Sequence, residues 1–146
     1  MNAESRRNTA VWLARLAVAT VFALNVSCAL LFILRPQDYA WGFELTGVPG
    51  EAMMRGMGVL FLMWNIPYIF AALHPVKNFI SLIEAVIMQF VGVSGESLIL
   101  LGLPGGHPQI TTSVTRFIIF DGAGLVVLVT ALLLILPVRR KLTQKA

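Results

Sequence analysis

The chain has 146 residues, enough for one domain, and its composition is not that of an ordinary soluble globular protein. Hydrophobic residues make up 58% of it and charged residues only 12%, whereas about 25% of a typical soluble domain is charged. The net charge of +4 is modest, and the basic residues gather near the two ends, which suits an anionic lipid surface and not a nucleic-acid partner. The single cysteine, Cys28, excludes an intramolecular disulfide, and no motif of a metal site is present.

Four windows of the sequence are long and apolar enough to span a bilayer, which takes about 20 residues. They cover residues 10–34, 52–73, 79–101 and 112–136. Six of the seven prolines fall at or between the ends of these windows, where helix breakers belong, and only Pro67 lies inside one. The sequence therefore predicts an all-α integral membrane four-helix bundle, formed by residues 1–146 as a single domain.

The second window contains the stretch "LFLMWNIPYIF", in which Pro67 removes a backbone donor and frees the carbonyl of Met63. Asn65 or Tyr68 is placed to serve the loosened backbone. One interpretation is a tolerated kink, which is common in membrane helices. The other is a binding pocket at the kink, walled by Trp64 and Tyr68.

The third window carries a stripe of small and polar residues in an otherwise apolar helix. Its members, Ser81, Ala85, Gln89, Gly92 and Glu96, recur at intervals of three and four residues. Such spacing places them on one helical face. In a membrane, small residues mark close helix contacts and polar residues face the bundle interior, so this window is predicted to be a central helix.

Charged residues within the windows fall at matched depths. Arg15 and Glu84 lie near one end of their spans, and Glu96, Arg55 and Arg116 lie near the other end. An unpaired charge at a helix centre costs about 2.5–3.5 kcal/mol, which favours pairing. We therefore predict intramembrane ion pairs between Arg15 and Glu84, and between Glu96 and Arg116 or Arg55. Such pairs either hold the bundle in register or line a polar cavity.

A second group of polar residues lies near the middle of the membrane. Asp121 lies nine residues into the fourth window, about 14 Å along the helix, which is too deep for its short side chain to reach the surface easily. It is expected to face the bundle interior and to form a hydrogen bond with at least one amide of similar depth. The candidate ligand-binding residues are Asp121, Gln89, Asn25, Asn65, Trp64 and Tyr68.

Lysine and arginine set the expected orientation. They occur before the first window (Arg6, Arg7), between the second and third (Lys77), and after the fourth (Arg139, Arg140, Lys141, Lys145). The opposite side has only Arg35 in a loop. The protein is therefore expected in a bacterial-type inner membrane or a plasma membrane, with both termini in the cytoplasm.

Three stretches in the first half of the chain carry a resemblance to a known family. They are "ARLAVATVF" in the first window, "RPQDYAWGFELTGVPG" in the loop, and "RGMGVLF" at the start of the second window. In their order they resemble the DoxX-like group of small four-helix membrane proteins. The resemblance implies a four-helix fold and, as in some members, a subunit of a quinone-linked or thiol-linked redox system. This chain lacks the paired cysteines of the thiol-linked members, and no catalytic residue carries over.

These observations leave three functions open. The favoured one is a non-enzymatic membrane protein, either an accessory subunit or a binder of a small lipophilic molecule. The second is a redox subunit or enzyme acting on a quinone or lipid-like substrate, with Asp121 and Glu96 in acid–base roles. The third is a small transporter component. No cofactor is predicted, apart from a quinone or lipid as a ligand. The expected partners are the lipid bilayer and either further copies of the chain or a larger membrane complex.

Overall fold

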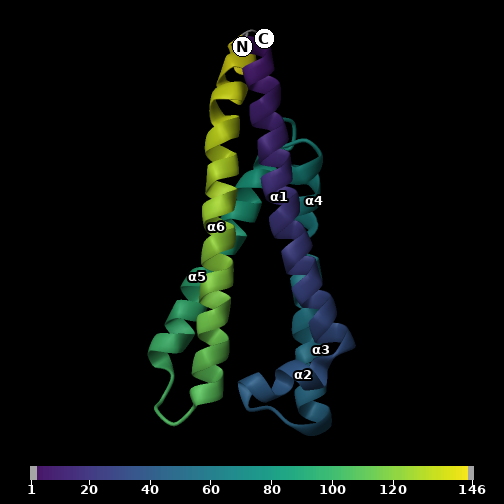
Figure 1. Cartoon of the computed structure of the whole chain (residues 1–146), viewed down its shortest axis with the longest axis vertical. Coiled ribbons are helices and arrows are strands. Elements are labelled where there is room, and N and C mark those ends of the chain that lie inside the picture. The colour runs from purple at the N-terminus through teal and green to yellow at the C-terminus, as the bar shows by residue number, and fades with distance from the viewer. Residues whose placement is uncertain (1–2, 145–146) are drawn as a thin grey trace.

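The computed structural model describes residues 3–144 and is entirely helical over that range apart from the short connections, which confirms the predicted all-α class. In chain order the elements are α1 (Ala3–Leu34), α2 (Pro36–Ala40), the 3₁₀ helix η1 (Trp41–Phe43), α3 (Gly47–Trp64), α4 (Ile66–Leu73), α5 (Phe79–Gly102) and α6 (Pro108–Thr143). The beginning of α1 and the end of α6 lie toward the same end of the molecule (Figure 1).

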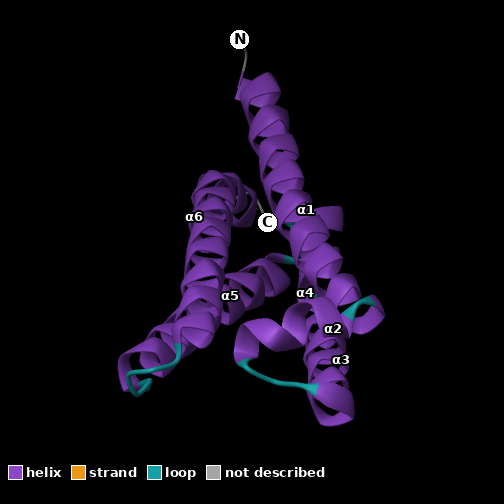
Figure 2. Ribbon diagram, turned by 60° about the horizontal axis from the view of Figure 1, so that its bottom comes forward, coloured by secondary structure: helices purple, strands orange, loops and turns teal. Residues whose placement is uncertain are grey.

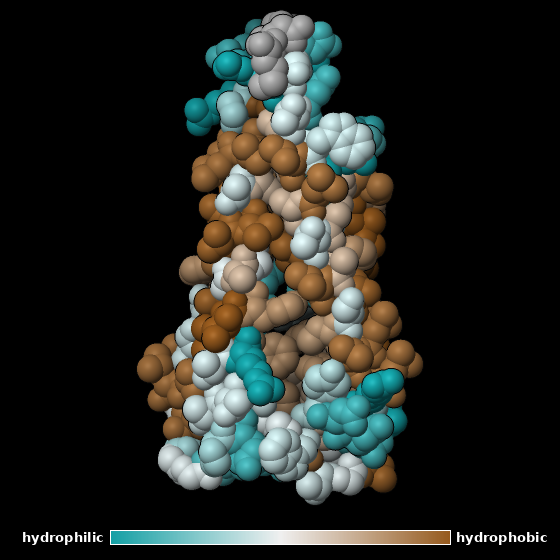
Figure 3. Space-filling view, viewed as in Figure 1, coloured by the Kyte–Doolittle hydropathy of each residue, from teal (hydrophilic) through white to brown (hydrophobic). Residues whose placement is uncertain are grey.

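Four helical segments are long and apolar enough to cross a membrane, as predicted. They are Glu4–Leu34, Gly47–Leu73, Phe79–Gly102 and Pro108–Lys141, of which the second combines α3 and α4. On the face shown in Figure 3, hydrophobic side chains cover most of the middle, and hydrophilic ones gather toward the two ends. Length, composition and surface are those of an integral membrane protein.

Two of the helices are longer than the predicted windows. α1 has 32 residues and α6 has 36, which correspond to about 48 and 54 Å, against about 30 Å of hydrocarbon. Pro137 was expected to end the fourth span, but α6 continues through it to Thr143. Ile135 and Val138 on either side of the proline are buried, so apolar packing holds the helix together there.

The helices form two arms that separate toward the end opposite the termini (Figures 1 and 2). One arm pairs α1 with α3, and the other pairs α5 with α6. Near the termini α1 packs directly on α6, and α4 joins α1 to α5. The spans are therefore close-packed at one end and open at the other.

Small residues allow the close packing at the end near the termini. Ala14, Ala71, Ala85 and Ala131 are completely buried there, together with larger side chains such as Leu82. Small side chains let helix backbones approach closely, which is how helices associate in lipid.

An aromatic cluster lies toward the end of the molecule opposite the termini. Phe32 is buried and its ring lies 5.0 Å from that of Tyr39, 5.8 Å from that of Phe61 and 5.9 Å from that of Phe117. These four rings come from α1, α2, α3 and α6. The cluster therefore connects the two arms where their backbones have moved apart.

The predicted face of α5 is the one that packs. Of its predicted members, Ala85 and Gln89 are buried, and Ser81, Gly92 and Glu96 are half-buried. The inward orientation of this face is confirmed, but the prediction of a central helix is wrong. α5 packs mainly on α6 and α4, whereas α1 packs on α3, α4 and α6, because the two arms separate α5 from α1 and α3.

The second span is broken at Asn65, between α3 and α4. The Asn65 side chain donates through Nδ2 to the carbonyl of Phe61 at 2.7 Å. This confirms that the Asn65 side chain bonds a backbone carbonyl at the break, although that carbonyl belongs to Phe61 and not to Met63. Pro67 follows in the first turn of α4, where its missing donor costs little.

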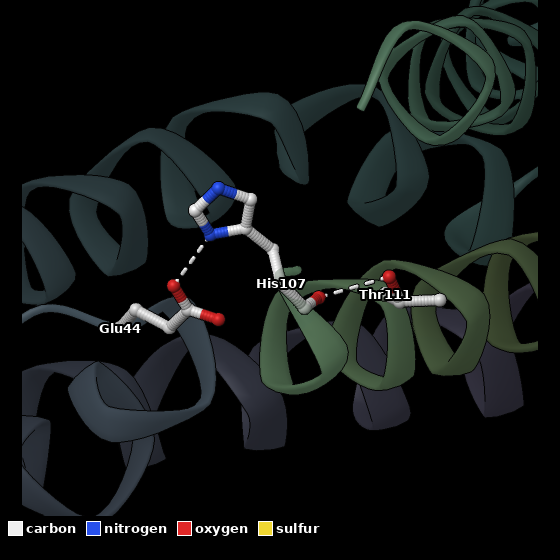
Figure 4. Close-up of polar contacts among 3 residues, drawn as sticks. All are labelled: Glu44, His107 and Thr111. Atoms are coloured by element: carbon white, nitrogen blue, oxygen red, sulfur yellow. Dashed lines mark hydrogen bonds and ion pairs between the residues drawn. The ribbon is translucent and has the colours of Figure 1, made fainter. Parts of the chain in front are cut away.

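The segment α2–η1 and the residue that follows it are fixed to the start of α6 by two polar contacts. Ser113 Oγ donates to the carbonyl of Gly42 at 2.7 Å, and His107 Nδ1 lies 2.7 Å from Glu44 Oε2. Figure 4 shows the second contact, together with the Thr111 hydroxyl, which donates to the His107 carbonyl at 2.9 Å. These contacts tie the two arms together at the membrane surface.

The α1–α3 contact generates a stability prediction. A Cβ on Gly58 would lie 2.7 Å from both the Ala29 carbonyl oxygen and Ile33 Cγ1, and backbone cannot easily move away. Gly58→Ala should therefore lower the free energy of unfolding by about 1–3 kcal/mol, measured by thermal or denaturant unfolding in detergent. Gly56→Ala is the matched control, because a Cβ there meets nothing within 4 Å. Equal stabilities of the two variants would contradict the close approach of α1 to α3.

Candidate functional site

The predicted ion pairs of Glu96 do not form. Arg55 pairs instead with Glu51, one turn away on the same face of α3, at 3.3 Å. Arg116 is exposed and lines a cavity near the membrane surface. Glu96 lies on the other arm from Arg55, and one of its carboxyl oxygens is buried without a hydrogen-bond partner. Equal depth did not predict the pairing of Arg55 with Glu96, because α3, which carries Arg55, and α5, which carries Glu96, diverge at that level.

Arg15 and Glu84 do not pair either. Arg15 Nε donates to the carbonyl of Ala72 at 3.0 Å, and its guanidinium lies 4.4 Å from the centre of the Trp12 ring. Ala72 is in the last turn of α4, where carbonyls lack partners within their own helix. Glu84 is exposed on the outside of α5. The arginine therefore caps a helix end, and the pairing prediction is corrected.

A chain of hydrogen bonds crosses the bundle through Gln89. Its Nε2 donates to Asp121 Oδ1 at 2.8 Å and to the Asp121 carbonyl at 3.2 Å. Its Oε1 accepts from the Tyr68 hydroxyl at 2.7 Å, and that hydroxyl also lies 3.2 Å from the Ala85 carbonyl. The chain joins α4, α5 and α6 at mid-membrane, and it confirms that Asp121 bonds an amide of similar depth.

Two glycines make room for this chain. A Cβ on Gly92 would lie 2.5 Å from Asp121 Oδ2, and one on Gly124 would lie 2.8 Å from Gln89 Nε2. Any larger residue would displace the polar atoms. The pattern of glycine beside a polar residue in both helices thus permits side-chain hydrogen bonds at a close helix crossing.

An inner cavity of about 300 Å³ opens beside the chain of hydrogen bonds. All six candidate ligand-binding residues line it: Asp121, Gln89, Asn25, Asn65, Trp64 and Tyr68. Glu96 joins them, as do apolar residues from α3, α5 and α6. The structure therefore brings the six residues together around one space, while their role in binding stays a prediction.

Two of the residues that line the inner cavity carry a covered side-chain oxygen without a hydrogen-bond partner. Asn65 is only 4% exposed, and its Nδ2 is occupied by Phe61 while its Oδ1 accepts nothing. Glu96 Oε2 is in the same condition. A buried polar atom without a hydrogen bond costs about 1–3 kcal/mol. Both oxygens are covered by protein atoms, so a molecule in the cavity does not reach them in this conformation.

An outer cavity of about 620 Å³ lies nearer the α2–η1 segment. Tyr39, Trp41 and Arg116 are among its lining residues. It shares Cys28, Phe117 and Phe120 with the inner cavity, so one set of side chains forms the boundary between them.

Sequence reasoning missed the shared boundary. Four residues of α6 follow one another at intervals of three, one and three positions, so they share one face of the helix: Phe117, Phe120, Asp121 and Gly124. That periodicity was a usable signal, because it aligns two aromatic rings with the buried carboxyl. Cys28 carried no comparable signal, since it is a lone cysteine in an apolar run.

The lining residues limit the chemistry of the inner cavity. Its described lining contains two carboxyl groups, three side-chain amides, a phenol and a thiol, but no lysine, arginine or histidine. Across residues 3–144, no group of three or more His, Cys, Asp or Glu side chains is placed to hold a metal ion. The arrangement suits hydrogen bonding and charge recognition of a ligand with an apolar body.

Comparisons of this chain with protein-family models, with curated proteins and with solved structures find no match. The resemblance to the DoxX-like group therefore stays a prediction from the sequence.

The hydrogen bonds of Gln89 generate a second prediction. Gln89→Met keeps the side chain's length but leaves Asp121 without its donor, so the free energy of unfolding should fall by about 1–2 kcal/mol. Asp121→Asn should leave it nearly unchanged, because the amide oxygen still accepts from Gln89 Nε2. Unfolding of both variants in the same detergent checks this. A larger loss for Asp121→Asn than for Gln89→Met would show that the carboxylate charge, and not the hydrogen bond, holds the crossing.

Proposed function

We propose that this protein is a non-enzymatic integral membrane protein that binds a small lipophilic molecule in the inner cavity. One observation carries the proposal: between membrane-length helices lies a cavity of about 300 Å³ with apolar walls, and polar side chains, among them those of Asn25, Gln89 and Asp121, converge on it.

The physical reason is that polar side chains around a cavity in the hydrocarbon region have no bulk water to bond. A molecule that exchanges hydrogen bonds with them there gains affinity. The walls supply the complementary apolar contact through Phe61, Trp64 and Phe120 among others. A pocket with apolar walls and a few convergent polar groups is the usual form of a small-molecule site.

A redox subunit or enzyme is the alternative, favoured by the presence of Asp121 and Glu96 in one cavity. A transporter component is the third candidate, favoured by the helix break at Asn65, since broken helices line many transport sites.

Both termini are proposed to face the cytoplasm of a bacterial-type inner membrane or a plasma membrane. The ends of α1 and α6 lie at the same end of the molecule, and they carry Arg6, Arg7, Arg140 and Lys141. Lys77 lies in the connection between α4 and α5, and Lys145 lies outside the described residues. An excess of basic residues marks the cytoplasmic side of a membrane protein.

The orientation is tested with reporter fusions. A reporter that is active only in the cytoplasm should work when fused after residue 146, and one that is active only outside should work when inserted in the loop of residues 36–50. Activity of the two reporters in the opposite compartments, or of both on one side, would contradict the proposed orientation.

Ligand binding is tested by filling the inner cavity. Gly95 lines it, and a Cβ there meets nothing within 4 Å, so Gly95→Leu should occupy the space without disturbing the fold. The protein is labelled with a photoreactive lipophilic alcohol, and the labelling is quantified by mass spectrometry. It should fall about tenfold or more, because the leucine side chain fills space that the alcohol would occupy and so removes well over one kcal/mol of binding free energy.

Gly102→Leu is the matched control for this experiment. Gly102 is on the same helix, a Cβ there also meets nothing within 4 Å, and it is not among the residues lining the inner cavity. Labelling of this variant should match that of the unaltered protein. Undiminished labelling of correctly folded Gly95→Leu would exclude the inner cavity as the binding site.

A further inference from the structure

We infer that the outer cavity binds the headgroup of a zwitterionic phospholipid, with the phosphate at Arg116 and the ammonium group at Asp38. The inference goes beyond the proposed function, because it concerns the second cavity and a lipid of the membrane itself. It is drawn from two opposite charges without partners, from walls that change from polar to aromatic, and from the exposed tryptophan in the lining.

Two charged side chains of opposite sign line the outer cavity, those of Arg116 and Asp38. Both are exposed, so a molecule in the cavity reaches them. Among the described residues, neither forms an ion pair with the other or with a third side chain. A ligand with one negative and one positive group complements such a lining, whereas a simple anion or a simple cation matches one of the charges and is repelled by the other.

The depth of Arg116 makes a partner for it important. It lies eight residues after the start of α6, about 12 Å along the helix. The carboxylates nearest this end of the molecule are engaged elsewhere, since Glu44 contacts His107 at 2.7 Å and Glu51 pairs with Arg55 at 3.3 Å. A guanidinium group matches a phosphate through two parallel hydrogen bonds, which assigns the phosphate to Arg116.

The wall beside Arg116 is polar because one face of α6 carries polar side chains there. Its members follow one another at intervals of three, one and three positions and all line the outer cavity: Gln109, Thr112, Ser113 and Arg116. The hydroxyl groups of Thr112 and Ser113 donate to the carbonyls of Pro108 and Gly42, at 2.8 and 2.7 Å. Their protons are used within the protein, so their oxygens are left to accept hydrogen bonds from an ammonium group.

Farther along α6 the wall becomes aromatic. Phe117 and Phe120 line both cavities together with Cys28, and Phe32 also lines the outer one. A headgroup bound at Arg116 therefore has apolar side chains next to it, where the chains of a lipid begin. A water-soluble zwitterion such as an amino acid has no apolar part for this surface, so the order of the walls favours a lipid.

Trp41 indicates the level of the outer cavity in the membrane. It lines the cavity and is 66% exposed, and Tyr39 lines the same cavity from the preceding turn. Tryptophan and tyrosine side chains are enriched at the level of the lipid headgroups. The two unpartnered charges thus share a cavity with the residues that mark this level, where a phosphate and an ammonium group are abundant.

The experiment measures lipid binding to the purified, delipidated protein by native mass spectrometry. Phosphatidylethanolamine and phosphatidylglycerol with the same acyl chains are titrated separately in one detergent. The first is expected to bind about fivefold more tightly, because phosphatidylglycerol carries the phosphate but no cation for Asp38. O-phosphoethanolamine, the headgroup without chains, is the third probe, and it should bind at least about tenfold more weakly than the lipid.

Charge-neutral variants locate the headgroup. Arg116→Gln should weaken binding of both lipids about tenfold, because both carry the phosphate. Asp38→Asn should weaken binding of phosphatidylethanolamine about fivefold without weakening that of phosphatidylglycerol. Arg55→Gln and Glu51→Gln are the matched controls, since neither residue lines the outer cavity, and they should leave both affinities unchanged. Circular dichroism and unfolding of each variant establish that the fold is retained.

The outcomes separate this inference from the proposed function. Equal affinities for the two lipids, or lipid binding insensitive to Arg116→Gln, would overturn the headgroup inference. Binding of O-phosphoethanolamine as tight as that of the lipid would overturn the lipid as the source of the headgroup. Labelling of the inner cavity by the lipophilic alcohol should be unchanged in Arg116→Gln, because Arg116 does not line that cavity. The proposed function therefore stands or falls on the Gly95→Leu experiment alone.

Discussion

The hydrogen bond from Gln89 to Asp121 is the contact on which the open shape of this protein depends. It lies where α5 and α6 come so close that only Gly92 and Gly124 leave space for the two polar side chains. Through Tyr68 the same amide also reaches α4, so three helices meet at one side chain. Because interhelical association in lipid gains little from the hydrophobic effect, a polar contact at a close crossing fixes the positions of these helices more firmly than apolar packing alone.

The cavities follow from where this contact lies. On one side of it small side chains let α1, α4, α5 and α6 pack closely, and on the other side the two arms diverge (Figure 1). The aromatic cluster around Phe32 and the contact of His107 with Glu44 join the arms again near the membrane surface. The helices are thus held at mid-membrane and at the surface, and the space between these two levels is the inner cavity and its outer neighbour.

Helical periodicity was enough to predict which residues face this space, but not which residues pair. The stripe from Ala85 to Glu96 and the depth of Asp121 identified the inward faces, since spacing fixes direction around a helix axis. The partners of Arg55 and Arg15 could not be predicted, because depth along the membrane says nothing about the distance between helices. Local alternatives decided both cases: a glutamate one turn away for Arg55, and an unpaired helix-end carbonyl for Arg15.

The two unpaired oxygens differ from several hydroxyl groups in the spans, which are satisfied within the protein. Hydroxyl groups such as those of Thr20, Ser97 and Thr130 donate back to the carbonyl four residues earlier, which removes any need for an outside partner. Among the described residues that carry buried side-chain nitrogens or oxygens, only Asn65 and Glu96 keep such an atom without a hydrogen bond, and both line the same cavity. If the polar residues served only to hold the bundle, each unpaired atom would reduce its stability with no compensating contact. Both residues line the inner cavity, so the polar atoms that the bundle leaves unpaired are gathered where its helices diverge.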